Sequence, residues 1–368
     1  NGVNGVLPCV CEAKKSGIGK ALLPVSNYNE GRIVEKVNII PTNSLKMAVQ
    51  YINNGIIENQ RQDNPEQCRT TDKQEINYAD ICGQEAAKRA TMIAVAGMHN
   101  IMYIGPPGSG KTMMAKRIPT ILPPLTLHEA LETTKIHSVA GKIDRDTALM
   151  AQRPFRSPHH TISDVALVGG GAFPQPGEIS LAHNGVLFLD ELPEFKRTVL
   201  EVMRQPLEDR KIAISRAKFA VEYPASFMLV ASMNPCPCGY YNHPDRECVC
   251  APGVVQKYLS RISGPLLDRI DIHIEIVPVP FEKLSELKES ESSEKVRDRV
   301  IKARQIQELR FREIDGVYCN AQMSSKQMRS FAQIDKAGSD LLKNAMQRLN
   351  LSARAYDRII KVARTIAD

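Results

Sequence analysis

Eight consecutive residues have the side chains and the glycine spacing that bind a polyphosphate. The segment GPPGSGKT consists of Gly105, Pro106, Pro107, Gly108, Ser109, Gly110, Lys111 and Thr112. In the pattern G-x-x-x-x-G-K-[ST], backbone N–H groups surround phosphate oxygens, and the glycines leave room for their close approach. We expect Lys111 to reach the β- and γ-phosphates of ATP and the Thr112 hydroxyl to bind Mg²⁺.

A second motif supplies the acids that this chemistry needs. Val186–Glu191 reads VLFLDE, an apolar run that ends in two carboxylates, as expected at the C-terminal tip of a buried parallel strand. Asp190 can complete the Mg²⁺ site, and Glu191 can polarise the water that attacks the γ-phosphate. The two motifs together predict ATP binding and hydrolysis.

The elements around these motifs predict how they are positioned. Ile101–Ile104 is an apolar strand directly before the glycine-rich loop, and a helix that begins near Lys111 points its positive dipole end at the phosphates. Thr126–Glu129 (TLHE) has the sequence of a capping box at a helix start. Between Tyr78 and Pro280 strands and helices alternate, which indicates an open parallel sheet.

The segments on either side of the sheet domain indicate two further domains. Ala21–Pro24 and Val37–Pro41 are strand-like and Leu45–Ile52 is helical, an α/β pattern. After Pro280, apolar residues recur at helical spacing and Ser352 is a candidate N-cap, which predicts a helical bundle. The predicted division is an α/β domain over residues 1–57, a polar linker over 58–77, a sheet domain over 78–280 and a helical domain over 281–368.

Composition restricts the class of protein. The 368 residues include 43% hydrophobic and 24% charged residues, as in an ordinary globular protein, and no apolar run has the roughly 18 residues that span a bilayer. We therefore expect a cytoplasmic protein without a membrane partner. The net charge of +7 permits a polyanionic partner. With no tryptophan and 5% aromatic residues, contacts to nucleic acid would go mainly to phosphates.

Longer strings in the chain resemble those of one family. Arg153–Phe195, Met233–Gly253 and Arg261–Ile276 closely resemble the magnesium-chelatase-like AAA+ ATPases of the YifB/ComM group. The resemblance covers essentially the whole chain. It implies a P-loop AAA+ parallel sheet sandwiched by helices, a C-terminal all-helical lid, and ATP bound between neighbouring subunits of a ring, usually a homo-hexamer.

The resemblance also implies roles for single residues. Asn234 matches the polar sensor that orients water near the γ-phosphate, and Arg269 matches the arginine finger that reaches the neighbour's site. Arg354 matches the second sensor arginine of the lid, although a surface arginine at a helix start is the alternative. Arg261 fits an interface arginine or a structural ion pair equally well.

Residues 1–57 resemble the last part of a Lon-protease-like domain. In Lon proteases a catalytic lysine occupies the position where this chain has Leu7. Leucine cannot act as the base of that dyad, so we predict that this domain is not proteolytic.

Four cysteines fall within a short segment. Cys236, Cys238, Cys248 and Cys250 form two C-x-C pairs, which offer four thiolates for a structural Zn²⁺. The spacing is tighter than the usual C-x-x-C, so unrelated free cysteines are the alternative, and His243 between the pairs could replace one thiol. The pair His159 and His160 is better explained as structural than as a metal site or proton relay.

A basic segment precedes the predicted sensor strand. Arg204–Lys218 contains five basic residues, Arg204, Arg210, Lys211, Arg216 and Lys218. KIAIS and KFAVEY predict two strands of a hairpin. In helicase relatives this hairpin follows the nucleic-acid backbone in the central pore. An ordinary solvated hairpin explains the charges equally well.

These observations lead to one favoured function and two alternatives. The favoured function is a ring-forming ATPase that couples Mg·ATP hydrolysis to DNA remodelling or translocation, as in branch migration. One alternative is a metal-chelatase motor that acts through protein partners without nucleic acid. The other is a chaperone-like remodeller of protein substrates.

Overall fold

The computed structural model describes residues 2–55, 76–143, 149–171, 174–216, 219–243, 245–279 and 290–368. Most of the predicted linker over residues 58–77 and the beginning of the predicted helical domain at residue 281 lie outside these residues.

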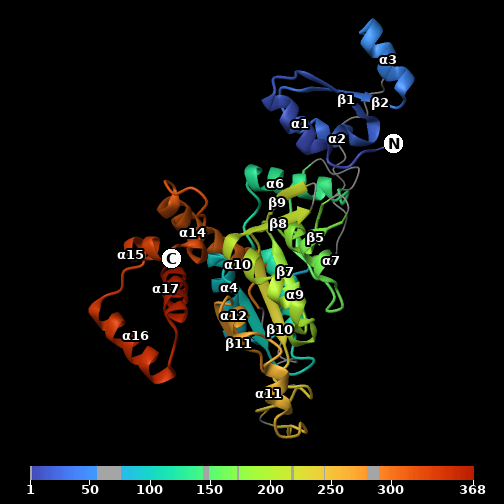
Figure 1. Cartoon of the computed structure of the whole chain (residues 1–368). Helices are drawn as coiled ribbons and strands as arrows, with labels where there is room; N and C mark the ends of the chain where they lie inside the picture. Colours follow the sequence, from blue (N-terminus) through green and yellow to red (C-terminus); the bar gives the residue numbers. More distant parts are fainter. Residues whose placement is uncertain are drawn as a thin grey trace.

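A parallel sheet forms the centre of the molecule (Figure 1). Its five strands have the order β11–β3–β10–β7–β4, and all neighbouring pairs are parallel. The strands are β3 (Ile101–Ile104), β4 (Phe155–Arg156), β7 (Val186–Leu189), β10 (Met228–Met233) and β11 (Ile272–Glu275). Because the strands are parallel, the residues that follow their carboxyl ends meet at one edge of the sheet.

Alternating side chains attach helices to both faces of this sheet. Val186 and Phe188 of β7 belong to the hydrophobic core that includes α4, α5 and α14, whereas Leu187 and Leu189 belong to the core of the opposite face. The first face is covered by α4 (Glu85–Gly97), α5 (Lys111–Ile121) and α14 (Ser293–Phe311). The opposite face includes α7 (Asp164–Val168), α8 (Glu178–Leu181), α9 (Arg197–Val202), α10 (Arg204–Asp209), α11 (Val254–Leu259) and α12 (Gly264–Leu267). The predicted parallel sheet between two helical layers is thus confirmed.

The central domain contains further elements. They are η2 (Tyr78–Asp80), α6 (Leu127–Val139), β5 (Gly169–Gly170), β6 (Gln175–Pro176) and η3 (Leu192–Glu194). The predicted capping box at the start of α6 is present, because Thr126 Oγ1 accepts the backbone N–H of Glu129 while the Glu129 carboxylate accepts that of Thr126.

The N-terminal part has its own small sheet, above the central domain in Figure 1. β1 (Lys20–Pro24) and β2 (Asn38–Thr42) pair in parallel, and α3 (Leu45–Asn54) follows them. The two predicted strands and the predicted helix are therefore confirmed to within about two residues. The other elements of this part are α1 (Val6–Lys15), η1 (Val25–Asn27) and α2 (Tyr28–Gly31).

A buried carboxylate joins this N-terminal part to the central domain. Glu30 accepts the backbone N–H of Leu7 at 2.9 Å and also the hydroxyl of Ser138, near the end of α6. Gly5 donates its backbone N–H to the Ser138 carbonyl at 3.1 Å. Since a buried carboxylate is costly without donors, these bonds tie α1 to α6. Leu7 itself is completely buried in the small apolar core of this part.

The C-terminal part is helical, as predicted. It continues from α14 through η4 (Asn320–Gln322), α15 (Ser325–Phe331), α16 (Lys336–Leu349) and α17 (Ala353–Ala367). Ser352 caps α17, because its hydroxyl accepts the N–H of Ala355 at 3.2 Å. In α16 only Leu342 is buried, whereas Leu341 and Leu349 are exposed. The predicted bundle is nevertheless confirmed, because α14, α15, α16 and α17 all contribute to one hydrophobic core. Within it, α16 stands apart from the sheet domain (Figure 1).

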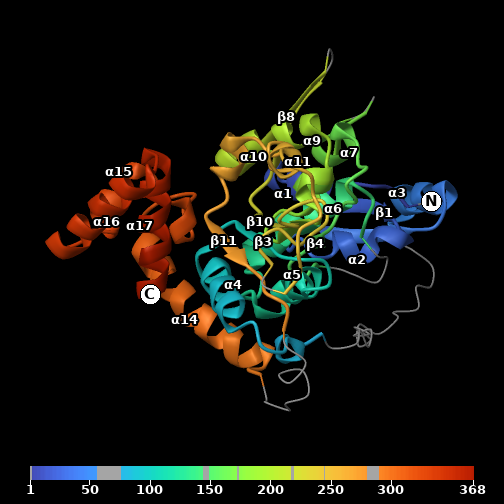
Figure 2. The same ribbon diagram turned by 90° about the horizontal axis from the view of Figure 1, so that it is seen from below.

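The predicted hairpin before β10 is present. β8 (Lys211–Arg216) and β9 (Phe219–Pro224) pair antiparallel, and Figure 2 shows them extending away from the body of the sheet domain. Residues 217 and 218, and the side chain of Arg216, lie outside the described part of the chain.

The basic residues at the start of this segment do not form a free surface. Arg204 is in α10 and pairs with Glu201. Arg210 donates to the carbonyls of Gly316 and Gln322 in the C-terminal part. Lys211 pairs with a glutamate of β9 at 2.8 Å. Of the five basic residues predicted for this segment, Arg204 and Arg210 therefore precede the hairpin strands, and both have intramolecular partners.

Candidate nucleotide site

The glycine-rich loop lies between β3 and α5, at the carboxyl edge of the sheet. Lys111 Nζ donates to the carbonyl oxygens of Gly105 at 2.7 Å and Pro106 at 2.8 Å, and to Asn234 Oδ1 at 3.1 Å. The ammonium therefore faces the loop rather than solvent. Asn234 directly follows β10, so the central strand brings the predicted sensor next to the predicted phosphate-binding lysine.

Glycine is needed in this loop for two different physical reasons. A Cβ on Gly105 would lie 2.3 Å from the carbonyl oxygen of Ile276, after β11. The room around Gly105 is thus needed for the protein's own backbone, not for phosphate as the sequence suggested. Gly108 and Gly110 have φ of 77° and 92°, and a Cβ on either would meet nothing within 4 Å. These two allow the left-handed turns of the loop and leave open space beside it.

Thr112 and Asp190 meet as the magnesium prediction requires. Thr112 Oγ1 donates to Asp190 Oδ2 at 2.7 Å, and Ser232 of β10 donates to the other carboxylate oxygen. A hydroxyl and a carboxylate are hard oxygen ligands of the kind that Mg²⁺ prefers. The residues present therefore fit a magnesium ion, which Thr112 and Asp190 would hold beside the phosphates.

Glu191 has an unusual backbone conformation. Its φ of 55° lies in the left-handed region, and its N–H donates to Ser232 Oγ at 3.3 Å. Its side chain is 57% exposed, and its carboxylate lies 3.8 Å from Nδ1 of His160. An exposed carboxylate in this place suits the predicted contact with a water molecule.

Two residues beside these acids were missed by the sequence reasoning. For Ser232, the only indication in the sequence is its position, two residues before Asn234 on an otherwise apolar strand. For His160 the sequence suggested only a structural role. Its Nδ1 faces the Glu191 carboxylate, and its ring is tilted by 34° against that of His159, with 4.1 Å between the ring centroids.

Burial and charge oppose each other at Lys111. Burial lowers the pKa of this ammonium, while the carboxylates of Asp190 and Glu191 act to raise it. Burial penalises the charged form of Lys111 because it removes water from the ammonium. With little water to screen it, the ammonium would attract a polyanion beside it more strongly than an exposed lysine would.

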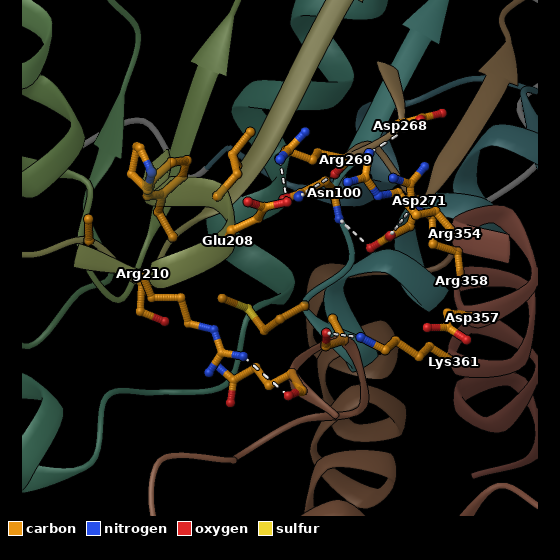
Figure 3. A pocket seen from close by; sticks show the side chains of 18 residues that line it. Asn100, Glu208, Arg210, Asp268, Arg269, Asp271, Arg354, Asp357, Arg358 and Lys361 are labelled. Carbon is orange, nitrogen blue, oxygen red and sulfur yellow. Dashed lines mark hydrogen bonds and ion pairs between the residues drawn. The ribbon is translucent and has the colours of Figure 1, made fainter. Parts of the chain in front are cut away.

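The two predicted arginines lie together in another place. Arg269 and Arg354 line a cavity of about 250 Å³ between the sheet domain and α17 (Figure 3). Arg269 Nη1 donates to the Pro265 carbonyl at 2.6 Å and Nη2 pairs with Glu208, so that 11% of the side chain is exposed. Arg354 Nη1 lies 3.9 Å from Asp268 and its side chain is 62% exposed.

This cavity is separate from the glycine-rich loop. Its lining includes no residue of Gly105–Thr112, nor Asp190, Glu191 or Asn234. The structure thus brings Lys111, Thr112, the two acids and Asn234 together and leaves Arg269 and Arg354 apart from them. Arg261 forms the ion pair that one of its two alternatives predicts, because its Nη1 lies 3.0 Å from both carboxylate oxygens of Glu194. Its role at a subunit interface stays a prediction.

The four predicted cysteine ligands also meet. The sulfurs of Cys236, Cys238, Cys248 and Cys250 all lie within 4.8 Å of one another. His243 is not part of this group; its Nδ1 accepts the backbone N–H of Asp245 at 3.1 Å. The suggested replacement of one thiol by His243 is therefore not supported.

Sequence comparison identifies the family of this chain. The sequence profile of the family described as "Magnesium chelatase, subunit ChlI" matches residues 77–284, and that of "Magnesium chelatase, subunit ChlI C-terminal" matches residues 290–368. The chain belongs to the magnesium chelatase ChlI family of AAA+ ATPases. The motifs quoted above thus identified the family correctly.

Individual relatives of this ChlI-family chain have different names. Competence protein ComM of Haemophilus influenzae is 42% identical over 376 residues, which cover 100% of this chain and 71% of ComM. Uncharacterized protein YifB of Escherichia coli is 46% identical over 293 residues, or 79% of this chain and 56% of YifB.

A third relative bears on the predicted Lon resemblance. Lon protease 2 of Bacillus subtilis is 34% identical over 161 residues, which cover 40% of this chain and 28% of that protein. The partial similarity to Lon proteases is thus confirmed. Within the described residues of this ChlI-family chain, no helix has the length and apolar character needed to cross a membrane.

Proposed function

We propose that this chain is the motor of a cytosolic ring, a homo-hexamer, that hydrolyses Mg·ATP and uses the energy to remodel DNA or to move along it. The observation that carries the ATPase part is the meeting of Lys111 with Asn234 and of Thr112 with Asp190 at one edge of the sheet. These pairs come from three separate chain segments, around residues 111–112, 190 and 234, that only the fold brings together.

Each residue has a task in the proposed reaction. Lys111 and the N–H groups of the loop bind the β- and γ-phosphates, and Thr112 and Asp190 hold the magnesium ion. The bound ion neutralises charge on the phosphate oxygens. Glu191 orients the attacking water and accepts its proton, and Asn234 fixes the position of this water beside the γ-phosphate.

A ring is needed to complete this site. The transition state spreads charge over the γ-phosphate oxygens, and an arginine commonly stabilises that charge. Arg269 and Arg354 line a cavity apart from their own glycine-rich loop. We propose that both arginines act on the ATP of the neighbouring subunit. Arg269 then exchanges its ion pair with Glu208 for the phosphate.

Support for DNA as the substrate comes from two sources. One relative, of which this chain covers 71%, is named for competence. The β8–β9 hairpin extends away from the sheet domain, as a strand-tracking element would (Figure 2). An alternative function is a chelatase-type motor that acts on protein partners, favoured by the match to the ChlI subunit profile.

The rate of ATP hydrolysis across DNA forms tests this proposal. The full-length protein is assayed with single-stranded, duplex and branched DNA over a range of salt concentrations. We expect stimulation that falls steeply with salt, because phosphate contacts release counterions. The ratio of rates with and without DNA should approach one in Arg216→Glu/Lys218→Glu and stay unchanged in Lys15→Glu, a surface control. Equal rates with and without DNA would reject the DNA function, and dependence on a protein partner would favour the alternative.

A further inference from the structure

The loop after β10 gathers four cysteine sulfurs into one cluster. Cys236 Sγ lies 3.3 Å from Cys238 Sγ and 3.7 Å from Cys248 Sγ, and the last two sulfurs are 3.5 Å apart. Cys250 completes the group, whose sulfurs all lie within 4.8 Å of one another. A tetrahedral site with Zn–S bonds of about 2.3 Å places its sulfurs about 3.8 Å apart. We propose that this cluster binds one structural Zn²⁺, which braces the nucleotide site.

The surroundings of the sulfurs suit a metal–thiolate site. Cys236 is buried, and the other three are partly covered. Four thiolates at tetrahedral spacing suit zinc and leave no open position for substrate or water. The ion is therefore structural.

The cluster is attached to the nucleotide site at two points. Cys236 follows Asn234 by two residues, and Asn234 Oδ1 accepts from Lys111 Nζ at 3.1 Å. On the other side, Gly239 lies against the glycine-rich loop, since a Cβ there would be 2.4 Å from Cδ of Pro107. A metal ion that fixes this loop therefore fixes both the sensor amide and Pro107. The effect of the metal on the nucleotide site rests on the proposed ATP site, whereas the metal site itself does not.

Metal analysis of the full-length protein tests the site. We expect about one zinc per chain, lost in Cys238→Ser and Cys248→Ser and retained in Cys82→Ser, an exposed cysteine outside the cluster. Replacement by Co²⁺ should give the visible absorption of tetrahedral cobalt–thiolate. A natively folded wild-type protein without metal, or zinc that both serine variants retain in full, would overturn the site.

A glycine pair tests the brace without touching the thiols, and keeps the proposal testable if the serine variants do not fold. Gly239 and Gly253 have similar φ, 85° and 81°, but a Cβ on Gly253 would meet nothing within 4 Å. Gly239→Ala should keep its zinc yet bind a non-hydrolysable Mg·ATP analogue roughly tenfold to a hundredfold more weakly, the loss expected from misplacing a binding group by about 1 Å. Gly253→Ala should bind it like the wild type.

The outcomes separate the two parts of the proposal. Equal nucleotide affinity in Gly239→Ala, Gly253→Ala and the wild type would overturn the brace even if zinc is present. A wild-type protein that binds zinc but no nucleotide would contradict the proposed ATPase function and leave the metal site standing.

Discussion

Mixed rings can decide which subunit supplies the arginines to each ATP. The perturbations are Glu191→Gln, which removes the group that activates water, and Arg269→Ala, which removes the finger. An arginine finger contributes about 10³- to 10⁵-fold to phosphoryl transfer, so rings made of either variant alone should have less than about 1% of wild-type kcat. Neither variant removes a residue of the glycine-rich loop, so both should still bind ATP.

The expected recovery in a mixture follows from the arrangement of the residues. Arg269 lies in a cavity apart from the glycine-rich loop, so each active interface combines Glu191 of one subunit with Arg269 of its neighbour. In an equal, random mixture of the two variants, half of the subunits have an intact Glu191 and the other half have an intact Arg269. About a quarter of the interfaces then have both, and about a quarter of the wild-type rate should return.

Mixed rings also test whether Arg354 acts on the ATP of the neighbouring subunit. Arg269 and Arg354 line one cavity of the same subunit, so both should act on the same neighbouring ATP (Figure 3). A mixture of Arg269→Ala and Arg354→Ala then has no subunit with both arginines intact, and it should stay inactive. If Arg354 instead served its own subunit's ATP, about a quarter of the rate would return.

The assay is steady-state phosphate release at saturating Mg·ATP, with ring formation checked by light scattering. Two results would refute the reasoning. Wild-type kcat in rings of Arg269→Ala would show that this arginine is not the finger. A mixture of Arg269→Ala and Glu191→Gln that forms rings without recovering activity would show that no arginine is supplied across the interface.

Two further predictions concern binding and stability. Lys111→Ala should raise the Kd for Mg·ATP by at least about a hundredfold, measured by calorimetry, because the charge-assisted contact to phosphate is lost. Burial by itself raises the pKa of Asp271, but the hydrogen bond from His99 and the charges of Arg358 and Lys361 hold it below its ordinary value. The resulting stability is present above the unfolded pKa, about 4, and is lost as pH falls through the lower folded pKa. Asp271→Asn should therefore be less stable than the wild type at pH 7, and the difference should shrink below about pH 4 in denaturant titrations.

Each of these predictions has a contradicting result. Unchanged nucleotide affinity in Lys111→Ala would remove the basis of the proposed function. For Asp271, a stability difference from the wild type that is constant between pH 7 and acid would mean that its ionisation does not stabilise the fold.

Local patterns in the sequence determined the nucleotide loop, its two acids, most strands and the helix caps. These features depend on near neighbours: a left-handed turn needs Gly108 and Gly110, a buried strand needs an apolar run, and the capping box needs Thr126 three residues before Glu129. The family resemblance then placed Asn234, which the sheet brings beside Lys111.

Only the tertiary structure decided which distant groups became partners. It placed Arg269 and Arg354 together and away from the loop, turned Arg210 toward the C-terminal part, and set Ser232 and His160 beside the acids. It also left Leu341 and Leu349 of α16 exposed. The physical reason is that strand order and helix docking arise from packing over the whole chain, so spacing along the sequence does not specify which side chains meet across it.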